Sequence, residues 1–370
     1  MTANIAFELA DKNTEGQFRQ LLRDNPLAGN IHVLLTREPD AFQAAAVSGD
    51  VFELMLAYRE SPRHLIGGCA RFEFDAFING RPRSVGYLGE LRMQGGLQQR
   101  RHALIEGYRQ IRRLHQAGNA PFYLTTIIAD NHSTRRLLER GLADMPTYRP
   151  LEMMVTLTLS TRQAVRLRPE PGVDIVPAGG FEALAMRLDE TGRDYQFHPV
   201  WSADRLRSGR RCRGIGLDDF VVAADANGVR GALCLWDQRA FKQTVVAGYS
   251  RQLGRLRPLL NLAAPALRQP RLPAPGGRLE SAFLSHLSVD PDDGATLLAL
   301  VGEAARRARG RGIEYLMLGM AERHPLRRTL QKRLYCHSYA SMIYVVYWDD
   351  GREAASGIDA RMPHPELALL

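Results

Sequence analysis

The sequence predicts an α/β fold of two tandem domains, each with a mixed sheet whose central parallel strands are splayed and flanked by helices. Three observations predict this class. Residues 84–141 pass through a strand, a helix, a second strand and a shorter helix. The same order returns over residues 282–348, which indicates a tandem duplication. The chain has 370 residues, a length that suits two domains better than one.

The first strand and helix follow each other with a very short connection. Residues 85–93 (VGYLGELRM) are rich in residues that favour strands. Gly95 and Gly96 end this strand, and a helix follows. Its apolar residues recur at the spacing of a helix that packs on a sheet: Leu104, Ile105, Tyr108, Ile111 and Leu114.

The start of this helix favours an anionic ligand. Unpaired backbone N–H groups and the helix dipole point at whatever lies above the turn, and a pyrophosphate suits them. Arg100 and Arg101 add positive charge. The alternative interpretation is an ordinary strand–loop–helix connection with a solvated arginine pair.

The second strand and helix complete the unit. Residues 122–129 (FYLTTIIA) form an apolar run between Pro121 and Asp130. Asn131 then starts a polar segment of the kind that begins helices, and Gly141 is a typical helix end. We therefore expect two parallel strands that splay around a ligand.

These residues resemble the core of the GNAT superfamily of acetyl-CoA-dependent N-acyltransferases. In that family the first strand leads into Gln/Arg-x-x-Gly-x-Gly/Ala at the start of the helix. Residues 98–103 (QQRRHA) match at Gln98 and Ala103, and depart at Arg101, where the family has glycine. Asn131 matches the asparagine that contacts the cofactor arm in the family.

The resemblance implies an acetyl-CoA-dependent transferase that acts on the amine of a small molecule or peptide by direct attack in a ternary complex. It also implies the residues that would bind the acetyl-CoA cofactor. These are Leu91, Arg92, Met93, Gln98, Gln99, Arg100, Arg101, His102, Ala103, Leu104 and Asn131.

Glu90 is the candidate catalytic base, because the family often places a carboxylate at the end of this strand. The alternative interpretation is a surface or ion-paired strand residue. The usual general acid is a tyrosine seven residues after the asparagine, and Leu138 replaces it here. Tyr148 or a water molecule is left to protonate the thiolate. A non-catalytic module that binds CoA or acyl-CoA is therefore the second hypothesis.

The predicted domains are residues 1–160, with the acetyl-CoA site, and residues 173–350. Residues 161–172 are polar and contain proline, so we expect a linker, and residues 351–370 are expected to form a weakly ordered tail.

The second domain is expected to be a degenerate copy that binds no cofactor. Pro291–Asp292–Asp293–Gly294 stands where a basic glycine loop belongs, and its two carboxylates would repel a pyrophosphate. His286 lies on the expected central strand of this domain and is a candidate acceptor contact if it faces the cleft between the domains.

Composition narrows the class of protein. Hydrophobic residues make up 45% and charged residues 24%, as in globular proteins, and we expect a cytoplasmic protein with no membrane partner. The four cysteines have no metal-ligand spacing, so no metal site is predicted. The net charge of +9 is almost entirely arginine, with three lysines, and clustered basic and aromatic residues of a nucleic-acid module are lacking. The sequence leaves open whether the chain forms a homodimer.

Overall fold

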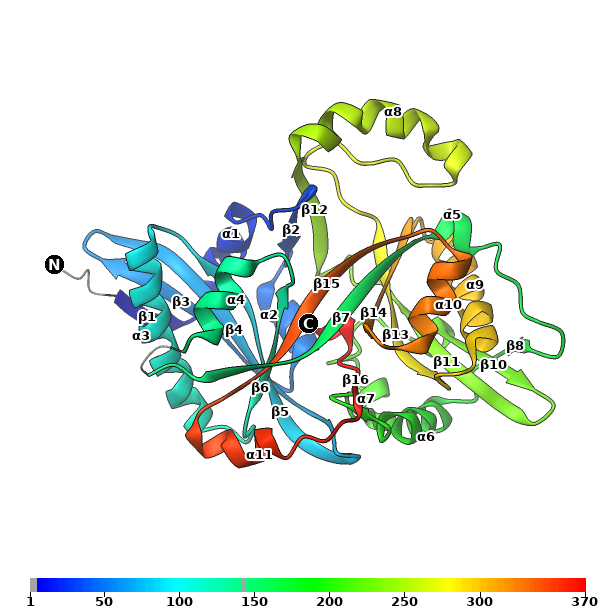
Figure 1. Cartoon of the computed structure of the whole chain (residues 1–370), viewed down its shortest axis with the longest axis horizontal. Helices are drawn as coiled ribbons and strands as arrows, with labels where there is room; N and C mark the ends of the chain where they lie inside the picture. Colours follow the sequence, from blue (N-terminus) through cyan, green and yellow to red (C-terminus); the bar gives the residue numbers. More distant parts are fainter. Residues whose placement is uncertain (1–4, 142–143) are drawn as a thin grey trace.

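The computed structural model describes residues 5–141 and 144–370, without the side chains of residues 97–99. Its main feature is one continuous sheet of twelve strands that runs through two lobes (Figure 1). The strands follow the order β1-β3-β4-β5-β6-β15-β7-β14-β13-β11-β10-β8. The structure is therefore a mixed α/β fold with a large sheet flanked by helices, as the sequence predicts.

The strands of the first lobe are β1 (Ile5–Leu9), β3 (Val51–Glu60), β4 (Arg63–Ile78), β5 (Arg81–Met93) and β6 (Tyr123–Ile128). Those of the second lobe are β8 (Asp174–Val176), β10 (Phe220–Asp225), β11 (Gly228–Trp236), β13 (Ser281–Val289) and β14 (Tyr315–Ala321). The long strands β7 (Thr147–Ser160) and β15 (Cys336–Tyr347) lie between the two lobes.

The two long strands exchange lobes. Strand β7 lies at the end of the predicted first domain, residues 1–160, but it pairs antiparallel with β14 of the second lobe. In return β15, which comes from the end of the second lobe, pairs antiparallel with β6 of the first. The apolar alternation of a strand shows which of its faces is buried, and it does not specify which neighbour the strand pairs with.

Helices cover both faces of the first lobe's sheet. On one face α3 (Leu97–Gln116) and α4 (His132–Glu139) pack through Leu104, Tyr108, Ile111 and Leu138 against Leu88 and Tyr123. On the other face α1 (Glu15–Asp24) and α2 (Ala41–Ser48) pack through Phe18, Leu22 and Ala45 against Phe72 and Tyr87. Leu88 and Tyr87 point to opposite faces because neighbouring residues of a strand alternate.

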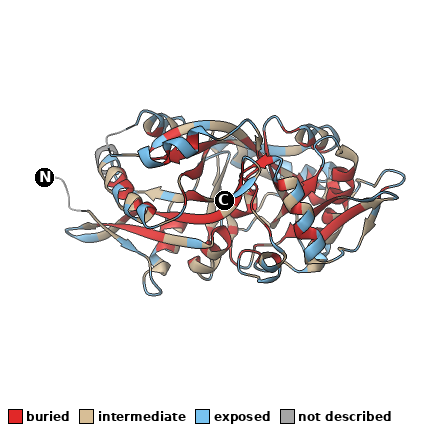
Figure 2. Ribbon diagram, turned by 90° about the horizontal axis from the view of Figure 1, so that it is seen from below, coloured by how far each residue is buried: buried red, intermediate tan, exposed pale blue. Residues whose placement is uncertain are grey.

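The second lobe is built in the same way. The helix α9 (Gly294–Gly310) packs on β13 and β14 in the largest apolar cluster, and α10 (Pro325–Arg333) joins it. The opposite face holds α6 (Phe181–Gly192), α7 (Ala203–Arg207) and Trp201, Trp236 and Phe241. Figure 2 shows buried residues along the strands of both lobes, with exposed residues on the outer sides of the helices.

A second, two-stranded sheet ties the lobes together. It pairs β2 (Ile31–Thr36) of the first lobe with β12 (Gln243–Tyr249) of the second. Helix α8 (Arg251–Leu267) follows β12 and stands out from the body of the molecule (Figure 1). Leu259 and Leu262 on this helix are exposed.

Residues 351–370 do not form the weakly ordered tail that we expected. After α11 (Arg352–Ser356), β16 (Met362–Pro363) pairs with β9 (Tyr195–Gln196), and a short 3-10 helix (Leu367–Leu369) ends between the lobes (Figure 1). Ala368 and Leu369 are buried there. Short stretches of this kind carry weak local signals, and their order comes from contacts with distant parts of the chain.

The expected linker is also partly structured. Its first residues form α5 (Thr161–Ala164), and Thr161 and Ala164 are buried against the second lobe. Among the helices in the described part of the chain, none has the length and apolar character that crossing a membrane requires.

Candidate active site

The central parallel strands of the first lobe splay apart. Strands β5 and β6 pair through Gly86–Tyr87 and Tyr123–Leu124 and then separate. Gly86 is required at the point of contact, because a Cβ atom there would lie 2.0 Å from the Tyr123 ring. The splay that the sequence predicts is therefore present, and it exposes the last residues of β5.

A β-bulge follows on β5 directly after the paired segment. Glu90 has a φ angle of 56°, and the register between β4 and β5 shifts at this point. Beyond it Met93 packs with Phe7 and Ala103 on the α3 face, while Glu90 contacts Arg37, which lies between β2 and α2. The bulge thus directs the acidic side chain toward the face that α1 and α2 cover.

The splayed strands open into a cavity of about 2250 Å³ that reaches from the start of α3, between the lobes, to α8. Its walls bring together nine of the predicted site residues. These are Glu90, Leu91, Arg92, Met93, Arg100, Arg101, Ala103, Leu104 and Asn131. His102 lies in the same turn but outside the cavity wall, and the side chains of Gln98 and Gln99 lie outside the described residues.

The first turn of α3 faces this cavity. Gly96 is the N-cap residue, and glycine has no side chain that could satisfy the first N–H groups of the helix. Arg100 and Arg101 are exposed at the cavity wall. The arrangement offers backbone donors, a helix dipole and two guanidinium groups to an anion.

Asn131 lies at the start of α4 on the opposite strand. Its side-chain oxygen accepts hydrogen bonds from the Thr134 backbone N–H at 3.3 Å and from the Ser133 hydroxyl at 3.2 Å. These bonds fix the orientation of the side chain on the cavity wall.

Glu90 is held by positive charge. Arg37 donates a hydrogen bond to its carboxylate, and a terminal nitrogen of Arg92 lies 3.9 Å from the second oxygen. Burial acts to raise the pKa of Glu90, but the charges of Arg37, Arg92 and Lys242 outweigh it and lower the pKa overall. Glu90 is therefore ionised at neutral pH, and its side chain does not point away from the cavity.

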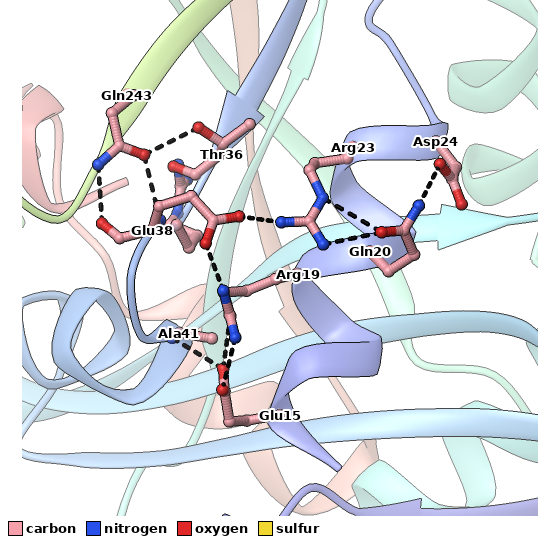
Figure 3. A network of polar contacts seen from close by, with 10 residues as sticks. Glu15, Arg19, Gln20, Arg23, Asp24, Thr36, Glu38, Ala41 and Gln243 are labelled. Carbon is pink, nitrogen blue, oxygen red and sulfur yellow. Dashed lines mark hydrogen bonds and ion pairs between the residues drawn. The ribbon is translucent and has the colours of Figure 1, made fainter.

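Arg37 is positioned from both lobes. Its neighbours Thr36 and Glu38 are hydrogen-bonded to Gln243 of β12, with the Thr36 hydroxyl at 2.8 Å and the Glu38 carbonyl at 2.8 Å (Figure 3). The Glu38 carboxylate also accepts from Arg19 and Arg23 on α1 (Figure 3). The segment that carries Arg37 is thus anchored to α1 and to the second lobe.

Lys242, next to Gln243, completes this charged group. Its ammonium donates to the Ser48 hydroxyl at 3.1 Å and to the Ala368 carbonyl at 3.2 Å. Burial, assisted by the charge of Arg37, lowers the pKa of Lys242 to about 7. The lysine is therefore partly neutral at physiological pH.

Two tyrosines share a hydrogen bond near the start of β7, in the first lobe. The hydroxyls of Tyr108 and Tyr148 are bonded to each other, and both residues line the cavity. Burial raises the pKa of both hydroxyls, so they keep their protons at neutral pH. Leu138 is buried beside them in the same apolar cluster.

His286 does not face the cleft that we expected it to line. It is fully buried, its ring lies 4.3 Å from the Trp201 ring, and its Nδ1 is 2.9 Å from the Ser285 hydroxyl. A bulge turns its side chain into the apolar interior of the second lobe. It is therefore no acceptor contact.

Sequence reasoning missed Arg37 and Lys242. Arg37 is one arginine among many, and nothing in its neighbourhood marks it. Lys242 carries a weak signal, since it is one of three lysines in an arginine-rich chain. Their proximity to Glu90 arises from the pairing of β2 with β12 across the lobes.

No protein-family model and no curated protein sequence matches this chain. Solved protein structures, in contrast, do match this chain. Two structures of Saccharomyces cerevisiae N-myristoyltransferase with bound myristoyl-CoA match it with TM-scores of 0.60 and 0.59, each at 9% identity. Both matches cover 94% of this chain, and they cover 79% and 83% of the transferase chains.

A GCN5-related N-acetyltransferase from Sphaerobacter thermophilus matches with a TM-score of 0.47 and 14% identity, over 79% of both chains. At these identities the likeness concerns the fold. The chain has the GNAT fold, and it shares this fold with the yeast transferase.

Proposed function

We propose that this protein is an acyl-CoA-dependent N-acyltransferase that acts on the amine of a small molecule or peptide in a ternary complex. The observation that carries the proposal is the splay of β5 and β6 into one large cavity. The uncapped start of α3, with two arginines, lies on that cavity together with the end of β5. The GNAT fold supports it.

The residues on the cavity wall suit the parts of an acyl-CoA molecule. The pyrophosphate would lie at the N–H groups after Gly96, with Arg100 and Arg101 beside it. The backbone of Leu91 to Met93, which is released from β6 by the splay, would align the acyl arm. Acyl-CoA would supply an activated thioester carbonyl.

Two side chains have proposed roles in proton transfer. Glu90 is ionised at the end of β5 and is our candidate base for the acceptor ammonium, directly or through water. Its lowered pKa makes it a weak base, so position must contribute more than basicity. Tyr148, which stays protonated and shares a hydrogen bond with Tyr108, is our candidate proton donor to the departing thiolate.

The length of the transferred acyl chain is a separate part of the proposal. Acetyl is our default proposal from the sequence resemblance. The cavity is larger than the roughly 300–1,000 Å³ of common small-molecule sites, so a longer acyl chain also has room. The yeast transferase structures with the same fold hold myristoyl-CoA.

Calorimetric titration with acetyl-CoA, octanoyl-CoA and myristoyl-CoA tests the proposal. We expect one site per chain and a binding constant weakened about tenfold or more by Arg101→Glu, because the reversal places a negative charge beside the pyrophosphate. Arg113→Glu is the matched control, since it makes the same change at the far, exposed end of α3. Absence of binding by all three would overturn the proposal.

A non-catalytic acyl-CoA-binding module is the second candidate. The pairing of Glu90 with Arg37 and Arg92, and Leu138 in place of the usual tyrosine, favour it. Release of CoA in the presence of amines, compared between the wild type and Glu90→Gln, separates the two. Binding without release in any amine mixture would support the module.

A further inference from the structure

The cavity wall on the acceptor side carries more positive than negative charge. Arg37 and Arg92 both line the cavity, and the carboxylate that they share is Glu90. All three side chains are at most 14% exposed. Because charges with so little access to water need partners, two guanidinium groups against one carboxylate leave a positive charge to be neutralised.

Arg92 is the less satisfied of the two arginines. One terminal nitrogen donates to its neighbouring Leu91 carbonyl at 3.0 Å, and the other is 3.9 Å from Glu90, beyond hydrogen-bond range. Its Nε is buried, and the described residues offer it no hydrogen-bond partner. The guanidinium therefore has unused donors at the edge of the cavity.

This charge lies away from the place that suits the pyrophosphate. The helix α3, with Arg100 and Arg101, covers the face of the sheet that holds Leu88 and Met93. Arg37 lies on the opposite face, between β2 and α2, and the bulge at Glu90 turns that side chain toward it. The cluster thus faces the compartment that remains for the acceptor once the cofactor occupies the α3 side.

The cluster is also rigid. Arg37 is held from both sides by the hydrogen bonds of Thr36 and Glu38 to Gln243, and Arg92 follows the bulge on a strand of the main sheet. Lys242 lies close enough to shift the pKa of Glu90 and adds positive charge whenever it is protonated. Binding sites for anions gain affinity from such fixed donors, because little freedom is lost on binding.

We infer that the acceptor amine carries a carboxylate, and that Arg92 and Arg37 bind this carboxylate. The acceptor class is then that of amino acids or of molecules with an amino-acid end. The inference rests on the proposed function for the amine, but the binding of the carboxylate itself requires no turnover.

The first test measures binding of a product-like pair to the full chain saturated with CoA. N-acetylphenylalanine and N-acetylphenylalaninamide differ in charge and hardly in shape. We expect the wild type to bind the carboxylate about tenfold or more tightly than the amide, because hydrogen bonds to charged groups are the stronger ones. Equal affinities, or binding of neither compound, would overturn the inference.

Two variants of opposite sign separate recognition from a merely structural role. Arg92→Gln should abolish the preference for the carboxylate and leave the amide within about twofold. Glu90→Gln removes the competing negative charge, so it should tighten binding of the carboxylate several-fold. A structural ion cluster would lose stability in both variants without these opposite shifts. Arg63→Gln, which removes a half-exposed arginine paired with Glu8, is the control.

The inference can be tested even if the Arg92→Gln variant does not fold. If Arg92→Gln is unstable, Arg92→Lys keeps the charge but loses the paired donors, and it should weaken the preference by several-fold. An unchanged preference in Arg92→Lys and in Glu90→Gln would overturn the inference.

Turnover tests the acceptor class separately. With acyl-CoA saturating, phenylalanine should release CoA faster than phenylalaninamide, and Arg92→Gln should raise the KM for phenylalanine more than it lowers kcat. If the binding preference is present but no amine is acylated, the proposed function fails and the carboxylate site stands. If both amines are acylated equally well, the function stands and the inference fails.

Discussion

The two lobes place the same irregularity at the same point of their central strands and use it differently. Glu90 on β5 and His286 on β13 both have a positive φ angle, 56° and 52°, where the register with an antiparallel neighbour shifts, β4 for β5 and β11 for β13. Glu90 lines the cavity, whereas His286 is completely buried among aromatic rings. Both lobes have the same backbone bulge. The side chain at the bulge and its surroundings determine whether the residue lines the cavity or packs in the core.

The helices that follow β5 and β13 also differ, in the residues that cap their N-termini. Helix α3 has Gly96 as its N-cap residue, so no side chain caps its first N–H groups. Helix α9 begins at Asp293, whose carboxylate accepts from the Thr296 N–H at 3.0 Å and from Arg230 at 2.7 Å. The protein's own carboxylate thus takes the place at α9 that we propose for the phosphates at α3.

The difference between the two helix starts bears on the role of the second lobe. We propose that it is a degenerate copy that binds no cofactor and that contributes Lys242, Gln243 and the long strand β15 to the first lobe. Three experiments test this contrast between the lobes.

The first compares the packed core of the second lobe with the open wall of the first. Leu300→Ala on α9 removes a fully buried side chain and should lower the free energy of unfolding by about 2–5 kcal/mol. Leu91→Ala, at a residue that is 39% exposed on the cavity wall, should cost under about 1 kcal/mol. Urea unfolding followed by circular dichroism measures both, and equal losses would contradict the contrast.

The second uses pH to distinguish the two bulge residues. Burial lowers the pKa of His286 to about 3, so in the folded state it is neutral at pH values where the unfolded chain, with a pKa near 6.5, takes up a proton. Its stabilising contribution is complete above about pH 6.5 and is lost as the pH falls, by about 1.4 kcal/mol per pH unit. His198 and His324, with pKa values lowered to about 4, act in the same direction.

Two carboxylates also bear on this pH experiment, one as an opposing titration and one as a control. Burial raises the pKa of Glu366, which accepts a hydrogen bond from the His286 backbone, to about 7, and its titration opposes that of the histidines. Burial acts to raise the pKa of Glu90, but the charges of Arg37, Arg92 and Lys242 outweigh it and lower the pKa overall. Urea unfolding midpoints should be measured at pH 6.5, 5.5 and 4.5. The midpoint of His286→Gln should change less with pH than that of the wild type, and the midpoint of Glu90→Gln should change as much as that of the wild type. A wild-type slope in His286→Gln would refute the explanation.

The third removes the carboxylate from the start of α9. Asp293→Ala should destabilise the protein by about 1 kcal/mol through loss of the cap, and Asp293→Asn, which keeps a capping oxygen, by less. Calorimetry should still find one acyl-CoA site per chain in both variants. A second site in either variant would show that Asp293 alone had closed the second lobe.

Local sequence patterns are sufficient to predict the individual strands and helices of the first lobe's core. The apolar periodicity of residues 85–111, the glycines after β5 and the polar start at Asn131 predict β5, α3, β6 and α4, and the structure contains them. These features depend on residues that are close in the chain, so propensity, periodicity and capping suffice to predict them.

How these strands and helices are joined, and which side chains come into contact, depends on long-range packing. The exchange of β7 and β15, the packing of residues 351–370 and the meeting of Arg37, Glu90 and Lys242 all depend on pairing between distant segments. Local patterns specify the faces of a strand or helix but not its neighbours, because pairing energies are shared among many alternatives of similar periodicity. The positive charge of Arg37 and Arg92 on the cavity wall therefore becomes visible in three dimensions and not along the chain.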